Sequence, residues 1–516
     1  MTAQWHAAWA QLPGYLSQHL LISLSAILLG AAISLPLAVL ASRHASLRWP
    51  VLTFASFIQT IPSLALLALF YPLLLALSAL SYSVLGVGFS ALGFLPSLLA
   101  LTLYSMLPML RNTATGLLGV DPAVVEAAKG VGMTPNQRLW WVELPLAAPV
   151  IMAGVRTAAV WTIGAATLAT SVGQTSLGNY IFSGLQTENW VSVLFGCAAS
   201  AVLALTADML LGLIENGLAN RSRIRVRSGV FGLLVAALAG LSPLVAVSNA
   251  PAYVIGAKNF SEQYILADLM AARLEARGAR VERREDLGSA VAYRALAASE
   301  IDAYVDYSGT LWANVVNHSN NPGRQQVLEG LTRELLARDR VVVLGSLGFE
   351  NAYALAMRRD RAEALGIRSL DDLARHAGQL TMGGDLEFFS RPEWVAVRDT
   401  YGLHFRSQRQ FQPTFMYRAL AGRDADVISA FSSDGRIAAD NLVVLTDPRQ
   451  ALPPYDAVVL ISPRRANDAR LRAALAPLIG RIPVQAMRSA NYSVDRDADK
   501  RTPAQAAMSL SSQLGL

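Results

Sequence analysis

Residues 49–110 contain no Asp, Glu, Lys or Arg, and this charge-free stretch is the strongest constraint that the sequence places on the fold. A helix needs about 20 consecutive apolar residues to cross the hydrocarbon core of a bilayer. The stretch is long enough for two such crossings, joined by a loop at Ser78–Gly93 that contains Gly and Ser. We therefore expect this part of the chain to lie in a membrane.

Charge is distributed unevenly along the 516 residues. Residues 1–252 hold 10 Lys and Arg and 6 Asp and Glu, whereas the rest of the chain holds 33 and 31. The first half is therefore predicted to be a membrane domain, and the second half a soluble domain with its own core. The net charge of +6 calls for no nucleic-acid partner, because its visible source is a cluster beside a hydrophobic segment, Arg221, Arg223, Arg225 and Arg227.

Cysteine and histidine give no sign of a covalent or metal framework. Cys197 is the only cysteine, so no intramolecular disulfide can form. The six histidines are scattered without the spacing of metal ligands. We expect no metal and no cofactor.

Six segments are apolar enough to span a membrane, and the basic residues between them set their orientation. The expected spans are Leu16–Ala41, Val51–Leu73, Leu92–Leu110, Ala148–Thr170, Val191–Leu213 and Val230–Val247. The basic residues lie in three loops, at Arg43 and Arg48, at Arg111, Lys129 and Arg138, and at Arg221–Arg227. The other two loops, Ser78–Gly93 and Val172–Trp190, contain no Lys or Arg. This pattern places the three basic loops in the cytoplasm, and the N-terminus and everything after Ala250 outside it.

The last hydrophobic segment has two interpretations. It can be a retained anchor, which we favour, or an internal signal that is cleaved after Val230–Ala250, where small residues follow it. The chain then divides into a membrane domain at 1–227, an additional anchor at 228–250 and a soluble domain at 251–516.

Residues 253–516 alternate between strand and helix patterns, which favours parallel α/β lobes. The strand candidates are Tyr253–Ala257, Ile301–Tyr307, Val341–Leu344, Val427–Phe431, Leu442–Leu445 and Ala457–Ile461. Ser261 is the expected N-cap of the first helix, whose apolar face consists of Ile265, Leu266, Leu269, Met270 and Leu274.

The cytoplasmic loop after the third span, at 121–145, contains a spaced motif. Small residues permit close docking of a short helix, a glycine turns the chain, and a proline ends the element before the next span. The motif consists of Glu126, Ala127 and Ala128, then Gly132 after three residues, and then Val142, Glu143, Leu144 and Pro145 after nine. It resembles the EAA loop of permeases of ATP-binding cassette (ABC) importers, from which only Val142 departs. An ordinary amphipathic loop is the alternative interpretation.

This resemblance implies partners. In that family the loop docks into a groove on an ATPase subunit, so Glu126, Ala127, Ala128, Gly132, Leu144 and Pro145 are expected to couple the chain to it. The chain has no GxxxxGK[ST] sequence, so the ATPase is expected to be a separate chain. The family also uses two copies of the membrane domain around one path, which implies a homodimer in the lipid bilayer.

The soluble half resembles the glycine betaine, choline and carnitine binding proteins through six ordered motifs. These are residues 256–263, 306–310, 351–355, 391–392, 432–437 and 453–456. The resemblance implies two lobes that close over a solute, lobe 1 at about 251–350 and 458–516 and lobe 2 at about 351–457. The chain is expected to cross between them near Asn351–Met357 and Tyr455–Ser462.

The same resemblance assigns the ligand-binding residues. An aromatic cage for a quaternary ammonium is expected from Tyr307, Tyr353, Phe431 and Tyr455, a carboxylate end from Lys258, Thr310 and Arg391, and a further contact from Asn351. Aromatic faces attract a trimethylammonium group, which has no N–H to donate, and Arg or Lys suits a carboxylate. Phe431 departs from the Tyr common in the family, and Glu393 and Trp394 depart from its usual Arg-Pro-Asp-Gly. Taken singly, each tyrosine could equally be a packing residue.

Two features of the membrane half carry weaker predictions. The segment Val172–Ile181 resembles the Gly-rich segment of osmoprotectant permeases, and a plain connecting loop is equally compatible with it. Asp208 lies within the fifth span, where an acid is a functional candidate. Its closeness to Glu215 at the inner boundary favours packing or snorkelling instead.

These observations together predict a multi-domain chain. An all-α polytopic membrane domain is followed by a two-lobed α/β domain like the periplasmic binding proteins, in the bacterial cytoplasmic membrane with the second domain outside. The expected function is ATP-driven import of glycine betaine or a related quaternary-ammonium compound, without enzymatic chemistry on this chain. Ergothioneine, choline and carnitine are alternative solutes, and a membrane-anchored ligand sensor is the alternative of another class.

Overall fold

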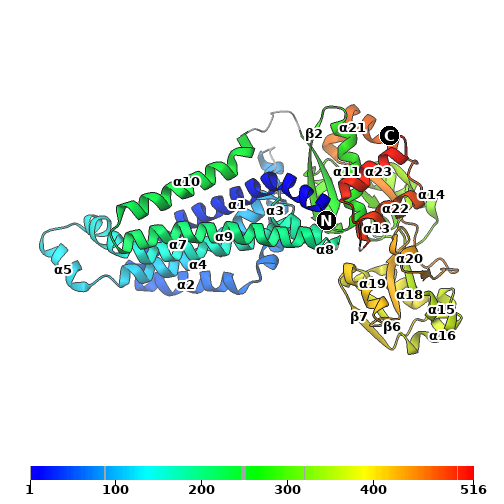
Figure 1. Ribbon diagram of the computed structural model, residues 1–516, viewed down its shortest axis with the longest axis horizontal. Coiled ribbons are helices and arrows are strands. Elements are labelled where there is room, and N and C mark those ends of the chain that lie inside the picture. Colours follow the sequence, from blue (N-terminus) through cyan, green and yellow to red (C-terminus); the bar gives the residue numbers. More distant parts are fainter. Residues whose placement is uncertain (1, 86–88, 188, 246–251, 319, 497) are drawn as a thin grey trace. The chain divides into compact units, whose positions relative to one another are not determined.

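The computed structural model describes residues 2–516 except 86–88, 188, 246–251, 319 and 497. It contains two compact units, one built from His6–Phe182 and Ser192–Asn249 and the other mainly from Ala250–Leu516. The first is helical and the second contains all the strands (Figure 1). The segment Val230–Ala250, for which cleavage is the alternative to a retained anchor, lies partly outside the described residues.

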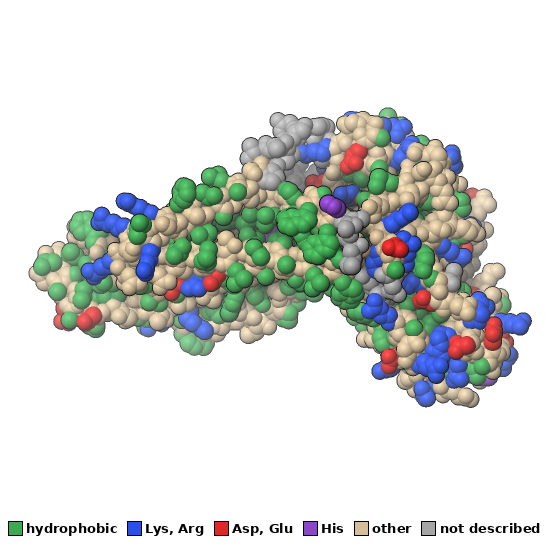
Figure 2. All heavy atoms as spheres, viewed as in Figure 1, with side chains coloured by type: hydrophobic (Ala, Val, Ile, Leu, Met, Phe, Trp, Pro, Cys, Tyr) green, Lys and Arg blue, Asp and Glu red, His purple; other side chains and the backbone are tan. Residues whose placement is uncertain are grey.

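In the described part of the chain, ten α-helices precede the first strand, with short irregular turns between them. They are α1 (Thr2–Arg43), α2 (Ala45–Thr60), α3 (Ser63–Leu85), α4 (Phe94–Leu118), α5 (Pro122–Gly130), α6 (Pro135–Arg138), α7 (Leu144–Ala166), α8 (Gly178–Gln186), α9 (Trp190–Ala219) and α10 (Arg223–Val245). Within the described residues, six helical segments are long and apolar enough to cross a membrane, namely Gln4–Arg43, Ser63–Leu85, Phe94–Leu118, Pro135–Val172, Trp190–Ala219 and Arg223–Ser242. Figure 2 shows hydrophobic side chains spread along these helices, with charged side chains gathered mainly toward the end that carries α5.

The second predicted span, Val51–Leu73, is wrong as a single helix. The helix breaks at Ile61 and Pro62, because a proline biases the preceding residue away from the helical region, and Ile61 is extended with φ −74° and ψ 125°. The following helix, α3, runs to Leu85, so the first part of the predicted loop Ser78–Gly93 is helical. Residues 86–88 of that loop lie outside the described part.

Two of the three predicted basic loops lie at the same end of the helical unit, where they are joined by ion pairs. Arg43 at the end of α1 and Arg138 in α6 both pair with the buried carboxylate of Glu143. The first loop and the 121–145 segment therefore lie at the same end, as their basic residues predicted. Which face of the membrane this end occupies stays a prediction.

Pro145 does not end a helical element. A π-helical turn at Leu139–Glu143 joins α6 to α7, and Pro145 lies in the first turn of α7. Proline is tolerated there because its missing N–H would lack an intrahelical partner in any case. The helical run is therefore continuous from Pro135 through α7 and a 3₁₀ segment to Val172.

The segment Val172–Trp190 is not a plain loop, since α8 occupies Gly178–Gln186; Glu188 lies outside the described part. Gly178 is required where α8 begins, because a Cβ there would lie 1.9 Å from the carbonyl oxygen of Thr167. The amide of Gly178 bonds to the Ser176 hydroxyl, and Asn179 accepts from the Ser176 amide.

Asp208 has a partner that the sequence did not reveal. The guanidinium of Arg156 in α7 makes two hydrogen bonds of 2.6 and 2.7 Å to it, and a third of 3.2 Å to Glu215. Gly212 lies between the two acids on α9, and a Cβ there would lie 3.2 Å from the guanidinium carbon. The glycine thus leaves room for an ion-pair network that links α7 to α9.

The soluble unit contains two five-stranded sheets. The first has the order β2-β1-β3-β10-β4 and the second β7-β6-β8-β5-β9. The strands are β1 (Ala252–Lys258), β2 (Arg280–Leu287), β3 (Ala303–Tyr307), β4 (Val342–Glu350), β5 (Tyr353–Arg358), β6 (Thr381–Gly384), β7 (Ser407–Gln410), β8 (Val427–Phe431), β9 (Leu442–Val444) and β10 (Asp456–Ile461). The chain leaves the first sheet at Asn351–Ala352 and returns to it between β9 and β10.

The expectation of purely parallel lobes is wrong, because both sheets are mixed. β10 runs antiparallel to β3 and β4, and β5 runs antiparallel to β8 and β9. The direction of β10 follows from the path of the chain, which crosses between the two sheets twice. Strand β4 leads out of the first sheet, and β10 leads back beside it in the opposite direction. The sequence analysis missed four strands, β2, β5, β6 and β7. Strands β2 and β7 are rich in charged and polar residues at the sheet edges, and β6 has only four residues.

Helices cover the faces of both sheets (Figure 1). Those after the first sheet's strands are α11 (Ser261–Glu275), α12 (Ser289–Ala297), α13 (Ser308–Asn314), α14 (Arg324–Asp339), α21 (Ala469–Leu475), α22 (Val484–Asp495) and α23 (Pro503–Gln513). The second sheet has α15 (Arg359–Leu365), α16 (Leu370–His376), α17 (Leu386–Ser390), α18 (Pro392–Tyr401), α19 (Pro413–Ala421) and α20 (Arg436–Ala439). The predicted apolar face of α11 is buried. Ser261 is not its N-cap, however, because Phe260 holds that position and the Ser261 hydroxyl donates to Asp495.

Candidate ligand-binding site

A cavity of about 490 Å³ in the soluble unit brings all eight predicted ligand-binding residues together. These are Lys258, Tyr307, Thr310, Asn351, Tyr353, Arg391, Phe431 and Tyr455. Lys258, Tyr307 and Phe431 lie at the carboxyl ends of β1, β3 and β8, whereas Tyr353 begins β5. Residues of both sheets therefore line one cavity, and their binding of a solute stays a prediction.

The aromatic rings of the cavity face several directions. Tyr353 lies 4.9 Å from Phe431 and 5.5 Å from Tyr455, with the latter pair nearly perpendicular at 81°. Phe260 lies 6.3 Å from Phe431 in parallel planes and 6.1 Å from Tyr307. Rings at different angles can surround a rounded cation with their negative faces.

The hydroxyl groups of two cavity tyrosines are turned away into the protein. Tyr307 donates to Glu262 over 2.6 Å and Tyr455 donates to Glu393 over 2.5 Å. Burial raises the pKa of both hydroxyls well above the usual range, so both stay protonated at neutral pH. The two tyrosines therefore present ring carbons rather than oxygens to the cavity.

Lys258 is already paired with a carboxylate of the chain. Its ammonium binds Asp306, both side chains are buried, and the ammonium lies 5.3 Å from the centre of the Tyr307 ring. Asp306 also accepts from the Tyr304 hydroxyl over 2.5 Å. A role for Lys258 at the carboxylate end of a solute stays a prediction.

Arg391 lies at the point where the predicted carboxylate end meets the cage. Its guanidinium is 3.5 Å from the Thr310 hydroxyl, 3.4 Å from Glu393 and 5.4 Å from the centre of the Tyr353 ring. The planar guanidinium can present a fork of donors to a carboxylate. Arg391 and Thr310 thus lie together, as the sequence motifs predicted.

The structure adds cavity residues that sequence reasoning missed. They are Asn259, Phe260, Ser289, Asp385, Leu386, Gln410, Phe411 and Gln412. Phe260 stands inside a quoted motif, between Lys258 and Glu262, and could have been assigned. Asp385 and Phe411 directly follow β6 and β7, and ligand sites of α/β domains form at such carboxyl ends. The short, polar β7 gave no strand pattern that could have placed the last three.

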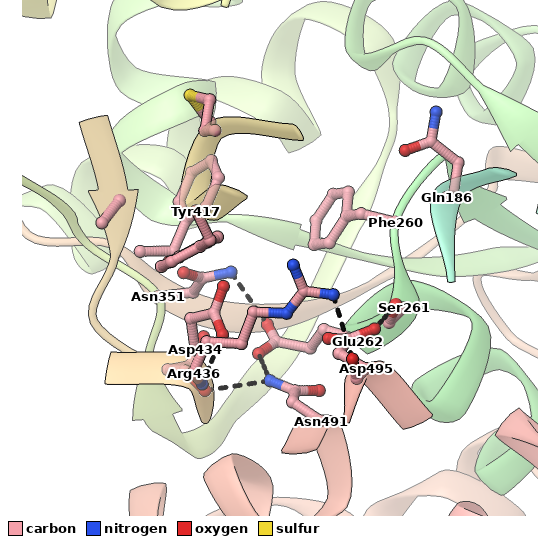
Figure 3. Close-up of a pocket in the computed structure, with 14 residues that line it drawn as sticks. Gln186, Phe260, Ser261, Glu262, Asn351, Tyr417, Asp434, Arg436, Asn491 and Asp495 are labelled. Carbon is pink, nitrogen blue, oxygen red and sulfur yellow. Dashed lines mark hydrogen bonds between the residues drawn. The ribbon is translucent and has the colours of Figure 1, made fainter. Parts of the chain in front are cut away.

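A smaller cavity of about 90 Å³ lies behind the cage, and Figure 3 shows its polar lining. Glu262, Asp434 and Asp495 approach one another there, with Arg436 and Asn491 between them (Figure 3). The Glu262 carboxylate accepts from Asn351 over 3.1 Å and from Asn491 over 2.8 Å. Burial raises the pKa of Glu262, and the hydrogen bonds that it accepts oppose that rise. Asn351 lines both cavities, so it connects the two.

The buried carboxyl group of Asp286 predicts that the soluble unit is more stable at acidic than at neutral pH. Burial raises the pKa of Asp286 to about 7, and its Oδ2 has no hydrogen-bond partner among the described residues. Such a group contributes stability below its unfolded pKa, and this contribution is lost as the pH rises through the folded value. We expect the melting temperature of the purified chain to fall between about pH 4 and about pH 7.

Asp286→Asn should flatten this fall by several degrees, since about 1 kcal/mol corresponds to roughly 2–4 °C in a domain of this size. Asn also tolerates the positive φ of 63° at this position. Asp360→Asn, at an exposed site, is the control and should keep the wild-type profile. A profile equally steep in Asp286→Asn and wild type would contradict the assignment to Asp286.

The predicted coupling residues are grouped at the end of the helical unit that carries α5. Glu126 and Ala127 are exposed on α5, and Ala128 is buried. Gly132 has a left-handed φ of 83°, as the expected turn requires, and open space where a Cβ would lie. Large apolar side chains are exposed nearby, at Val124, Val131, Trp140 and Trp141.

Comparisons with known proteins identify both halves. Residues 251–510 match the family described as the substrate binding domain of ABC-type glycine betaine transport systems, which is half of the chain. Residues 28–220 match the family described as the inner membrane component of binding-protein-dependent transport systems. The chain belongs to these ABC importers, as a permease fused to a substrate-binding domain. The predicted fold class and family are thereby confirmed.

Individual relatives differ in how much of this importer subunit they cover. The ergothioneine transport permease/ergothioneine binding protein of Helicobacter pylori (strain G27) is 30% identical over 486 residues, covering 90% of this chain and 84% of the relative. The choline transport system permease protein of Bacillus subtilis (strain 168) is 41% identical over 201 residues, covering 39% and 85%. A solved structure titled as a glycine betaine/carnitine/choline ABC transporter covers 51% of this chain and 98% of its own, with 25% identity and a TM-score of 0.45.

Proposed function

We propose that the importer subunit captures a small quaternary-ammonium solute and passes it through its membrane domain, driven by ATP hydrolysis on a partner chain. The observation that carries this proposal is the cavity in which Tyr307, Tyr353, Phe431 and Tyr455 surround one space beside Arg391. A trimethylammonium group loses little by leaving water and gains about 0.5–2 kcal/mol from each ring face. A carboxylate on the same solute suits Arg391.

Glycine betaine is the first candidate, because the soluble half belongs to the family of glycine betaine binding domains. Ergothioneine is a second candidate, favoured by the relative that shares both halves of the chain and is named for ergothioneine. Both solutes carry a trimethylammonium group and a carboxylate, so the same cage and the same arginine suit them. Ergothioneine adds a sulfur-bearing imidazole ring, for which Gln410, Gln412 and Asp385 supply polar groups at the cavity wall.

Calorimetric titration of the purified full-length chain in lipid nanodiscs tests this proposal. Glycine betaine, ergothioneine, choline and carnitine are compared with proline, a zwitterion that lacks a trimethylammonium group. Saturable binding of at least one trimethylammonium solute, and none of proline, is the expected result. Absence of binding by all four would contradict the proposal.

The assembly that follows from this function has an ABC ATPase subunit, two copies of the membrane domain and the lipid bilayer as partners. We place the membrane domain at 1–227, the anchor at 228–250 and the binding domain at 251–516, with lobe 2 at about 351–457. The binding domain is proposed to lie on the outer face of the cytoplasmic membrane, because the basic residues of the first half lie in the loops on the opposite side.

A reporter fusion tests this sidedness. Alkaline phosphatase, which is active only outside the cytoplasm, should be active when fused after Ala252 and inactive when fused after Asn220. The physical reason is the distribution of Arg43, Arg48, Arg111 and Arg221–Arg227, which are expected on the inner side, and a fusion after Asn220 retains the first three of these. A cytoplasmic reporter fused at the same two positions should give the opposite pattern. Activity of the phosphatase at Asn220 would mean that the number of crossings is wrong by one.

A further inference from the structure

Two tyrosines of the cage each donate a hydrogen bond to a buried glutamate, a contact that attraction by the ring faces alone does not require. The hydroxyl of Tyr307 donates to Glu262, and that of Tyr455 donates to Glu393, over 2.6 and 2.5 Å. The two acids are 3% and 2% exposed, so each is a carboxylate held inside the protein behind a ring that lines the cavity. Burying a carboxylate costs free energy unless its oxygens accept hydrogen bonds.

Glu262 is surrounded by donors. The side-chain amides of Asn351 and Asn491 donate to it together with the Tyr307 hydroxyl. Figure 3 shows Glu262 between Asn351 and Asn491. Amide nitrogens can only donate, so the carboxylate serves as the acceptor for both. Such an arrangement favours the ionised form and opposes the effect of burial. Asn351 lies where the chain crosses from β4 to β5, so the network also reaches the connection between the sheets.

Glu393 lies in the first turn of α18, next to Pro392. One of its carboxylate oxygens accepts from both the Tyr455 hydroxyl and the Arg391 guanidinium. Glu393 thus contacts a ring of the cage and the cation beside that ring.

Each cation of the cavity lies beside an acid of its own. Lys258 pairs with Asp306, and Arg391 pairs with Glu393. Glu262 behind Tyr307 and Asp385 in the cavity wall are further acids, and Arg436 lines the smaller cavity together with Glu262. A permanent cation in the cage would therefore lie in front of acids that are held behind Tyr307 and Tyr455.

We propose that Glu262 and Glu393 are positioning residues of the cage, and that their charge, acting through Tyr307 and Tyr455, makes the site select a solute with a quaternary nitrogen over one of the same shape that has carbon in its place. A phenol that donates to a carboxylate gains electron density, which makes the face of its ring more negative. The bond also fixes the plane of the ring. This inference rests on the proposed function, because it requires a quaternary ammonium in the cage.

If the ring faces alone attracted the cation, Tyr→Phe substitutions in the cage would cost little binding free energy, and Phe431 would be an example of a ring without a hydroxyl. In this cage, Tyr307→Phe and Tyr455→Phe each remove a hydrogen-bond donor from a buried carboxylate. Leaving a buried carboxylate without that donor costs free energy. We therefore expect both substitutions to weaken binding of the cation.

The test compares each trimethylammonium solute that the wild-type chain binds with the analogue that has carbon in place of the quaternary nitrogen. For glycine betaine this analogue is 3,3-dimethylbutanoate, and for choline it is 3,3-dimethylbutan-1-ol. The shape is the same and only the charge is lost. Dissociation constants are measured by calorimetry on the full-length chain for wild type, Glu262→Gln and Glu393→Gln, with melting curves as a check of folding.

Wild type should prefer the cation, and each Glu→Gln variant should reduce that preference by about fivefold to thirtyfold. Asp339→Asn is the matched control, because Asp339 also accepts from a tyrosine, Tyr293, over 2.6 Å but does not line the cavity. It should leave the preference unchanged. If a Glu→Gln chain does not fold, Tyr307→Phe and Tyr455→Phe provide the same comparison, since each removes the O–H through which the carboxylate acts.

Equal weakening of the cation and its carbon analogue would overturn the inference, because a purely structural role affects both ligands alike. An unchanged preference in both variants would overturn it as well. In either case the proposed function would survive, since wild type still binds a trimethylammonium solute. Failure of wild type to bind any such solute would instead refute the proposed function itself.

Discussion

Gly132→Glu is expected to abolish uptake of solute while solute binding remains at the wild-type level. Gly132 has a φ of 83°, which residues other than glycine adopt only with backbone strain. It lies in the exposed turn after α5. A glutamate there adds a charge and bulk to the segment that is expected to dock on the ATPase. The measurement is uptake of the labelled solute by cells that express the chain with its ATPase, together with calorimetry on the purified variant.

Gly366→Glu is the matched control for this experiment. Gly366 also has a positive φ, 66°, and open space where a Cβ would lie, but it belongs to the soluble unit. The control therefore reproduces the backbone strain without altering the segment after α5, and uptake should persist. Normal uptake by Gly132→Glu would contradict the coupling role of this turn.

Arg391→Met is expected to weaken glycine betaine about tenfold to a hundredfold and to affect choline far less. Hydrogen bonds to a charged group contribute about 1.5–3 kcal/mol, and only betaine has a carboxylate to accept them. Methionine keeps much of the volume of the side chain beside Tyr353. Calorimetry with both solutes on one protein preparation separates loss of the carboxylate contact from a general loss of the cavity.

Removing Arg391 also takes a partner from Glu393, so a general effect has to be measured. Arg398→Met, at an exposed position on the same helix as Glu393, controls for loss of positive charge in this lobe. It should bind both solutes as wild type does. Equal losses of betaine and choline in Arg391→Met would show that Arg391 shapes the cavity rather than contacts a carboxylate.

The sequence predicted the membrane half well because hydropathy and charge act over whole segments. The length of the apolar segments was enough to predict six spans. The basic residues in the loops predicted that Arg43 and Arg138 lie at the same end of the helical unit. The break at Pro62 was missed because a single residue interrupts an otherwise continuous apolar run. The pairing of Arg156 with Asp208 was also missed, since their contact joins two helices and leaves no periodic signal.

In the cavity, too, the sequence predicted which residues come together but not the contacts between their side chains. The ordered motifs predicted eight residues that line one cavity, because most of these motifs lie where a strand begins or ends, whereas Arg391 lies between α17 and α18. What they could not reveal is the direction of the hydroxyl groups. Tyr307 and Glu262 are 45 residues apart, and Tyr455 and Glu393 are 62 apart, so their contacts depend on how helices and strands pack. The mixed sheets were missed for a similar reason, since strand direction depends on the path of the chain.

The uninterrupted helical run from Pro135 to Val172 has a mechanical consequence. It contains 38 residues, and a helix of that size is roughly 57 Å long at 1.5 Å per residue. Hydrogen bonds along its axis make such a rod stiff to compression, and Pro145 does not divide it into two levers. The run also contains the π-helical turn at Leu139–Glu143 and Pro149 inside α7, which are the kinds of place where a long helix bends. A movement of the turn that carries the exposed Trp140 and Trp141 would therefore reach Val172 through one continuous backbone, with any bend confined to these places.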